Sequence, residues 1–180
     1  FDSDKNIIIG NTVLYGATSG EIYISGVAGE RFGVRNSGAI AVVEGVGNHC
    51  CEYMTGGRVV VLGSTGSNFA AGMSGGIAYV LDENGDFDYY CNMGMVELSL
   101  VEDRVDVHEL NGLIARHFHF TRSKKAKMIL DNFEKYLPMF IKIIPYDYKK
   151  VLHEQKLEEL RKKIADVEVG IPKVIQGRLT

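Results

Sequence analysis

Three consecutive residues, His49, Cys50 and Cys51, have the types and spacing that could support metal or redox chemistry. Thiolates and imidazoles are common zinc ligands. Adjacent residues of a β-strand point to opposite faces, however, so the two thiols cannot reach one ion from a regular strand. Cys50 also occupies a position that holds Phe32 and Phe69 in neighbouring repeats, which is typical of a buried apolar residue. We therefore predict that these cysteines belong to the core.

Two further patterns suggest chemistry. His117 and His119 would share a face on a strand, but they diverge on the helix predicted for this segment, which argues against a metal pair.

The glycine-rich stretch 26–33 lacks the Lys-Ser/Thr pair of a phosphate-binding loop, and no βαβ unit surrounds it. The serines and threonines beside the glycines are explained by hydroxyls stacked between repeats. We predict no catalytic, cofactor-binding or metal-binding residue in this chain.

Charged residues within the repeats leave two interpretations open. Those embedded there are Arg35, Glu44, Glu52 and Arg58. They are either interface groups or internal ion pairs. An independent carbohydrate-active β-helix would instead need clustered acids on one exposed sheet. Asp86 and Asp88, beside aromatic residues 87, 89 and 90, lie only in the last repeats, so that interpretation is poorly supported.

Two columns of glycines indicate the element that positions all these residues. The first column, at spacings of 18, 18, 19 and 19, is Gly20, Gly38, Gly56, Gly75 and Gly94. The second, at spacings of 18, 19 and 19, is Gly29, Gly47, Gly66 and Gly85. Such periodicity indicates one repeated supersecondary unit, and we predict that these glycines occupy structural turns.

Short apolar runs follow the first column, at 21–25, 39–43, 57–61, 76–80 and 95–99. They alternate with period two and predict strands stacked in register, with Ile22 over Ile40 and Arg58 as the one polar exception on that face. A coil of 18–19 residues at ~3.3 Å per residue has room for three short strands and their turns. The pattern predicts a mainly β protein whose first segment is a parallel β-helix.

Past residue 100 the pattern becomes helical, so we divide the chain into a β-helix domain, 1–105, and a helical extension packing on it, 106–180. Helices are predicted at 107–121 and about 124–137, the second capped by Thr121 or Ser123. A strand or extended connector is predicted at 139–144. A last helix is predicted from an N-cap at Asp147 to Gly170 and Pro172. Its narrow apolar stripe is a candidate interface that consists of Leu157, Leu160, Ile164 and Val167.

Composition excludes several classes of protein. The net charge of −3 divides into −7 for residues 1–100 (4 Lys/Arg, 11 Asp/Glu) and +4 for 101–180 (16 and 12). No run of 18 apolar residues is present, so we expect neither a membrane span nor a membrane partner. We also expect no nucleic-acid partner. Three cysteines, two of them adjacent, suit a reducing compartment such as the cytoplasm. A first residue of Phe rather than Met suggests a fragment or a processed end.

Several long stretches resemble one family, the GXGXG domain that closes the large subunit of glutamate synthase. They are RNSGAIAVVEGVGNHCCEYMTGGRVVVLGSTGSNFAAGMSGGIAYV (35–80), NMGMVELSL (92–100), LNGLIARHFHFTRS (110–123) and KIIPYDYKKVL (142–152). The resemblance implies a right-handed β-helix followed by helices. It also implies membership of an oxidoreductase that makes two glutamates from glutamine and 2-oxoglutarate with reducing equivalents.

In that family an amidotransferase domain hydrolyses glutamine, and an FMN-binding barrel with an iron–sulfur cluster carries out reductive amination. The GXGXG domain is regarded as a structural brace between them, in the same chain or a separate one. This chain has no N-terminal catalytic cysteine, no barrel and no cluster-binding cysteine spacing, so the resemblance implies no cofactor and no catalytic residue here. A similar domain occurs in the C subunit of formylmethanofuran dehydrogenase, and a stand-alone β-helix binding module is a further alternative. The segment PYDYKKVL favours glutamate synthase.

Overall fold

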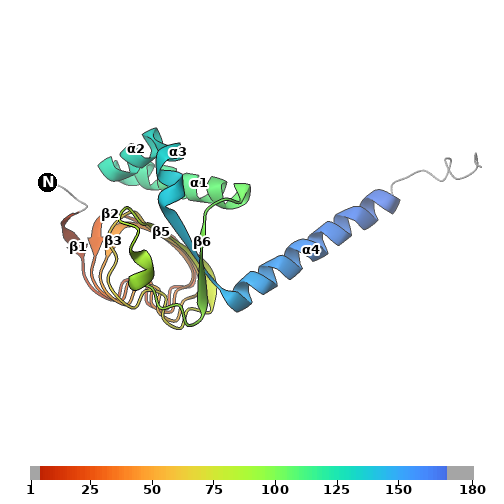
Figure 1. Cartoon of the computed structure of the whole chain (residues 1–180), viewed down its shortest axis with the longest axis horizontal. Coiled ribbons are helices and arrows are strands. Elements are labelled where there is room, and N and C mark those ends of the chain that lie inside the picture. Colours follow the sequence, from red (N-terminus) through yellow and green to blue (C-terminus); the bar gives the residue numbers. More distant parts are fainter. Residues whose placement is uncertain (1–4, 170–180) are drawn as a thin grey trace, which may run out of the picture.

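The first half of the protein forms a β-solenoid. The structure, a computed structural model, describes residues 5–169, with side chains described as far as residue 165. The solenoid has about four turns and is followed by a long C-terminal helix (Figure 1). Its parallel strands are β1 (Ile7–Ile9), β2 (Glu21–Ala28), β3 (Ser37–Val46), β4 (Thr55–Val61) and β5 (Gly75–Leu81). The predicted stacked coils are confirmed.

The register of β2 differs from the prediction by one residue. The structure pairs Glu21 with Ile40 and Tyr23 with Val42, so the predicted stacking of Ile22 on Ile40 is wrong. A register shift between Ile24 and Val27 explains the difference, because the spacing between paired residues changes from 19 to 18 along the same strand pair. A slip of one residue exchanges the two faces of a strand. Ile22 therefore packs against the solenoid interior.

The sheet separates two hydrophobic cores. The inner core fills the solenoid and includes Ala41, Val43, Val59, Val61, Ala78 and Val80. The outer core lies between the other face of the same strands and the helices, and includes Val42, Val60, Tyr79, Leu110, Leu113 and Ile114. Because both faces are covered, β5 is buried along its whole length. This arrangement also explains Arg58, which lies on the outer face beside the helices.

Two strands from the second half of the sequence complete the sheet. These are β6 (Val96–Leu100) and β7 (Phe140–Pro145), and the strand order is β1-β2-β3-β4-β5-β7-β6. The predicted stacking of 95–99 directly on 76–80 is wrong, because β7 lies between β5 and β6 and pairs antiparallel with both. The expected strand at 139–144 is confirmed. Strand β7 joins the segments before and after residue 105 in one sheet. Whether the two segments are separate domains stays a prediction.

Helices cover the outer face of the sheet, although the last of them contacts it only near its start. They are α1 (Arg104–Thr121), α2 (Lys124–Asp131), α3 (Phe133–Tyr136) and α4 (Tyr146–Val169), with 3-10 turns at Phe87–Tyr89 and Leu137–Met139. Ser123 caps α2 by accepting a hydrogen bond from the Ala126 amide, as predicted. The single helix predicted over 124–137 is wrong, because the backbone breaks at Asn132. The predicted N-cap at Asp147 is also wrong, since α4 already begins at Tyr146.

The last helix extends away from the rest of the protein (Figure 1). Near its start, Tyr148 and Leu152 pack against the outer core. Lys149 forms an ion pair with Glu97, and Lys156 lies 3.9 Å from Asp103. None of the helices within residues 5–169 has the length and apolar character needed to cross a membrane.

Three glycines of the first column lie at the starts of strands and permit close contact between coils. A Cβ atom on Gly56 would overlap the carbonyl oxygen of Ser37 in the preceding coil. Gly38 stands in the same relation to Thr18, and Gly75 to Thr55. These three glycines do not have positive φ angles, so close approach rather than a left-handed backbone requires them.

The other glycines of the two columns vary in their surroundings. A Cβ on three of them, Gly29, Gly47 and Gly66, would press on the preceding coil, whereas Gly20 and Gly85 combine positive φ with open space. A Cβ on Gly94 would meet the side-chain oxygen of Asn92 at 3.1 Å. One sequence column therefore contains glycines required for different physical reasons.

Each coil also contains a segment in which every second residue has a left-handed backbone. The twelve residues are Thr12, Leu14, Gly16, Arg31, Gly33, Arg35, His49, Cys51, Tyr53, Asn68, Ala70 and Gly72. Nine of them are not glycine and have φ between 53° and 65°. Each such residue costs roughly 1–2 kcal/mol in an isolated chain. Hydrogen bonds between coils, such as Arg31 N–H to Asn48 O at 2.8 Å, hold this conformation.

Candidate functional site

The three cysteines are buried thiols of the inner core, which confirms the placement predicted for Cys50 and Cys51. The argument that Cys50 and Cys51 point to opposite faces of a strand is wrong, because both residues lie in a turn and their Sγ atoms are 3.6 Å apart. Burial raises the pKa of Cys50 well above its ordinary value. Burial, with a smaller contribution from Cys51, raises the pKa of Cys91 to about 12. These two thiols therefore stay protonated at neutral pH and are poor nucleophiles or metal ligands.

The other chemical candidates are dispersed. His49 Nδ1 lies 2.7 Å from Glu52 Oε1, beside the cysteines but partly exposed. His117 is buried and His119 is exposed on α1, so they diverge as predicted. The glycine-rich stretch 26–33 runs from the end of β2 through a turn toward β3, and no helix begins within it. It therefore lacks the helix N-terminus on which a phosphate-binding loop depends.

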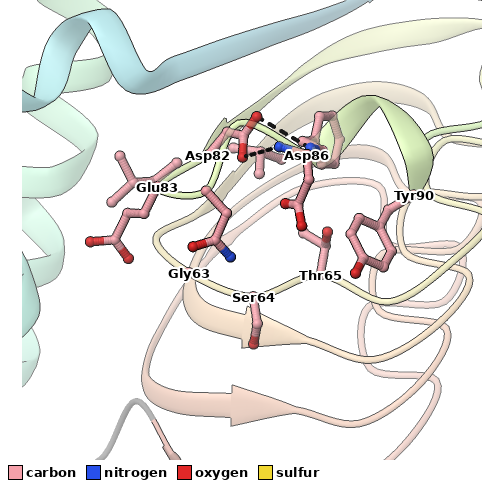
Figure 2. A pocket seen from close by; sticks show the side chains of 11 residues that line it. Gly63, Ser64, Thr65, Asp82, Glu83, Asp86 and Tyr90 are labelled. Carbon is pink, nitrogen blue, oxygen red and sulfur yellow. Dashed lines mark hydrogen bonds between the residues drawn. The ribbon is translucent and has the colours of Figure 1, made fainter.

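A pocket of about 230 Å³ lies beside the loop that follows β5 (Figure 2). Asp86 and Tyr90 line it, whereas Asp88 does not. The carboxylate of Asp82 points back into its own loop and accepts hydrogen bonds from the amides of residues 85, 86 and 87 at 2.8, 3.1 and 3.2 Å. Glu83 forms an ion pair with Lys125 at 2.8 Å. These two acids hold the loop and α2 in place, which accounts for them without substrate chemistry.

A buried polar contact joins the solenoid to the helices. The side chains of Glu44 on β3 and His117 on α1 are both 0% exposed. Glu44 Oε1 accepts hydrogen bonds from Ser25 Oγ at 3.0 Å and from Ser123 Oγ, and the latter hydroxyl also caps α2. His117 Nε2 lies 3.8 Å from the same oxygen, beyond hydrogen-bond distance. Glu44 thus connects β2, β3 and the start of α2 through one carboxylate.

A second polar network connects α1 to three strands. Glu109 accepts hydrogen bonds from Arg58 Nε at 2.9 Å and from the Tyr79 hydroxyl at 2.8 Å. Asp106 accepts from the same hydroxyl at 3.3 Å and from Lys142 Nζ at 2.5 Å. Burial and the adjacent Glu109 raise the pKa of Tyr79, so the phenol stays protonated and donates. The network fixes α1 over β4, β5 and β7.

Of the four embedded charged residues, three therefore form internal contacts: Glu44, Glu52 and Arg58. Arg35 is exposed and lines a shallow depression with Tyr53. Sequence reasoning missed the partners of these groups. Asp106 and Glu109 are three residues apart and therefore lie on one face of the predicted helix. This spacing could have identified them as the acidic partners of Arg58 and Lys142.

The apolar stripe on α4 is exposed in the structure. Leu157, Leu160 and Ile164 have exposed fractions of 41%, 49% and 59%. They lie on the part of the helix that extends away from the solenoid (Figure 1). The side chain of Val167 lies outside the described residues. An exposed seam of this kind is typical of a surface that packs against another helix.

Comparison with known proteins gives a consistent result. A family model described as the GXGXG motif matches residues 1–146. The chain is 58% identical over 164 residues to glutamate synthase [NADH] of Schizosaccharomyces pombe, covering 90% of this chain and 8% of that protein. It is 54% identical over 158 residues to the glutamate synthase [NADPH] large chain of Bacillus subtilis, covering 86% and 10%. It is 51% identical over 145 residues to the chloroplastic ferredoxin-dependent glutamate synthase of Spinacia oleracea, covering 81% and 9%. The chain thus spans about a tenth or less of the length of these relatives.

Proposed function

Because this chain belongs to the GXGXG-motif family, we propose that it is a structural, non-catalytic part of a glutamate synthase. In this proposal it holds the glutaminase domain and the FMN-binding synthase domain in a fixed relation, so that ammonia passes from one to the other. The observation that carries the proposal is the exposed stripe on a helix anchored to a doubly packed solenoid. A solenoid of stacked coils is stiff because its core is continuous along its length.

The polar groups of the chain support this interpretation. Glu44, Glu109 and Asp106 each contact hydroxyl or basic groups that tie helices to strands. Asp82 and Glu83 hold a loop and a helix. These acids are therefore engaged in keeping the solenoid and the helices together, which is what a brace requires.

The proposal assigns the cofactors and partners of the activity to other parts of the enzyme. FMN and the iron–sulfur cluster would be bound by the synthase domain, and the glutaminase nucleophile would lie in the amidotransferase domain. Both domains would contact this chain, from the same polypeptide or from another. Three buried free thiols support a reducing compartment, which we take to be the cytoplasm.

The proposal predicts that the isolated chain is inactive. Purified chain incubated with excess FMN and passed through a desalting column should retain no flavin absorbance, and chain supplied with glutamine should release no ammonia. A preparation of the complete enzyme in the same assays is the positive control. Stoichiometric retention of a yellow chromophore, or ammonia release proportional to the amount of chain, would contradict a non-catalytic role.

A further inference from the structure

The outer part of α4 combines an apolar stripe with basic flanks. With 3.6 residues per turn, positions seven apart lie on the same side of a helix, so one flank of the stripe carries three lysines: Lys149, Lys156 and Lys163. The other flank carries Asp147, Glu154 and Arg161. Beside the exposed stripe itself, between residues 155 and 165, all three flanking residues are therefore basic, whereas residues 1–100 of the chain are acidic overall. Lys149 and Lys156 lie beside Glu97 and Asp103 of this chain, so the positive charge that a partner meets over residues 157–164 comes from Arg161 on one flank and Lys163 on the other.

The part of α4 beyond its contacts with the outer core is residues 157–169, and it is apolar on one face. The contacts of Tyr148 and Leu152 near the start of α4 do not by themselves explain why this part is helical. From Leu157 to Val169 the helix extends roughly 20 Å. Helices of this length are marginal in water without packing. Within this part, Lys162 forms an ion pair with Glu158 at 3.1 Å on a highly exposed face, and solvent screening makes the contribution of such a pair small. Burial of the stripe would supply the missing stabilisation.

The flanks disfavour a second copy of the same helix as the partner. In a parallel pair, Lys156 of one helix faces Arg161 of the other across the seam. In an antiparallel pair, each flank faces its own equivalent, so lysine faces lysine. Like charges in these positions are destabilising. A bilayer surface also fits poorly, because a stripe confined to two positions in seven is the narrow seam of helix pairing rather than a broad membrane-binding face.

We propose that residues 157–164 of α4 form a docking site for an amphipathic helix with acidic flanks, contributed by another part of the enzyme. The apolar stripe packs against the apolar seam of that helix, and the basic flanks pair with its Glu and Asp residues. This inference rests on the proposed function, because it assigns the surface through which the brace engages a neighbouring domain.

Photo-crosslinking in the complete enzyme tests the docking site. Ile164, on the stripe, is replaced with p-benzoylphenylalanine in one variant, and Lys162, on the opposite face, is replaced in the matched control. After irradiation, the adducts are identified by mass spectrometry. We expect the Ile164 variant to yield an order of magnitude more adduct than the control, confined to one helical segment rich in Glu and Asp. Added Arg161→Glu and Lys163→Glu substitutions should reduce that yield, as should high salt.

Several outcomes would overturn the proposal. They are equal yields from the two faces, no adduct from either, an adduct between two copies of α4, and an adduct with a segment lacking acidic residues. Binding of the wild-type enzyme, but not the charge-reversed enzyme, to phosphatidylserine vesicles with no protein adduct would assign the surface to membranes instead. Because crosslinking reports position and not turnover, its failure is distinguishable from failure of the bracing function, which is judged by coupled activity.

Discussion

Replacing Gly56 with alanine is expected to destabilise the protein by about 1–3 kcal/mol, because the new methyl group would overlap the backbone carbonyl of Ser37. A backbone carbonyl cannot move aside as a side chain can. The strands of successive coils are hydrogen-bonded to each other, so separating one pair disturbs its neighbours. The change in the free energy of unfolding is measured by urea denaturation of the purified chain.

A matched substitution on α1 provides the control. Gly112 lies in the helix, and no atom beyond its chain neighbours and the nearby helix backbone lies within 4 Å of the point that a Cβ would occupy, so Gly112→Ala should stabilise the protein by about 0.5–1 kcal/mol. The same chemical change thus has opposite signs at the two sites. Equal effects at Gly56 and Gly112, or an unchanged urea midpoint for Gly56→Ala, would contradict the close approach of coils.

Removing the carboxylate of Glu44 is expected to cost about 3 kcal/mol or more, because it takes the acceptor from the buried hydroxyl of Ser123 and removes a buried charged group from its contacts. Glu44→Ala takes away the acceptor for Ser25 and Ser123 at once, and opens a cavity beside His117. Loss of the Ser123 contact also weakens the cap of α2. The expected result is a large fall in the urea midpoint, measured together with the loss of helical signal in circular dichroism.

Two comparisons make this prediction specific. Asp131→Ala removes an exposed partner of Lys127 on α2 and should change stability by about 0.5 kcal/mol or less. A double-mutant cycle of Glu44→Ala with Ser123→Ala should show strong coupling, since both changes remove one shared hydrogen bond. Additive effects in the cycle would refute the role of Glu44 as a tie between β3 and α2.

The repeat and the helix signals were readable from the sequence because they depend on local spacing. The glycine columns predicted stacked coils, and the alternation of apolar residues predicted β2 to β5. Ser123 was readable as a cap because its hydroxyl acts on an amide three residues later. The separation of His117 from His119 followed from helix geometry. These inferences needed only the spacing of residues within a turn or between successive repeats.

The remaining features depend on contacts distant in sequence or on backbone angles without a residue signature. The insertion of β7 between β5 and β6 joins residues about sixty positions apart, and no local pattern specifies it. The register of β2 depended on a shift within the strand that the glycine spacing concealed. Cys51 and Tyr53 adopt left-handed angles that these residue types rarely take, so nothing in the sequence indicated the turn that brings Cys50 and Cys51 together.

The candidate site could be predicted only in part for a related reason. The spacing of Leu157, Leu160 and Ile164 identified the stripe on α4 directly. The partners of Glu44 and Arg58 lie 79 and 51 residues further along the chain, at the start of α2 and on α1. Their complementarity becomes visible only when α1 and α2 are placed over the outer face of the sheet.

The most direct test of the bracing function measures coupling between the two half-reactions. Leu160→Asp and Ile164→Asp are combined in the complete enzyme of the proposal, and ammonia released is compared with glutamate formed. Gln155→Asp with Lys162→Asp, on the opposite side of the same helix, is the matched control. We predict that the stripe variant retains glutaminase activity but leaks ammonia, while the control stays coupled. A stripe variant that assembles normally and keeps the wild-type ratio of ammonia to glutamate would contradict the account.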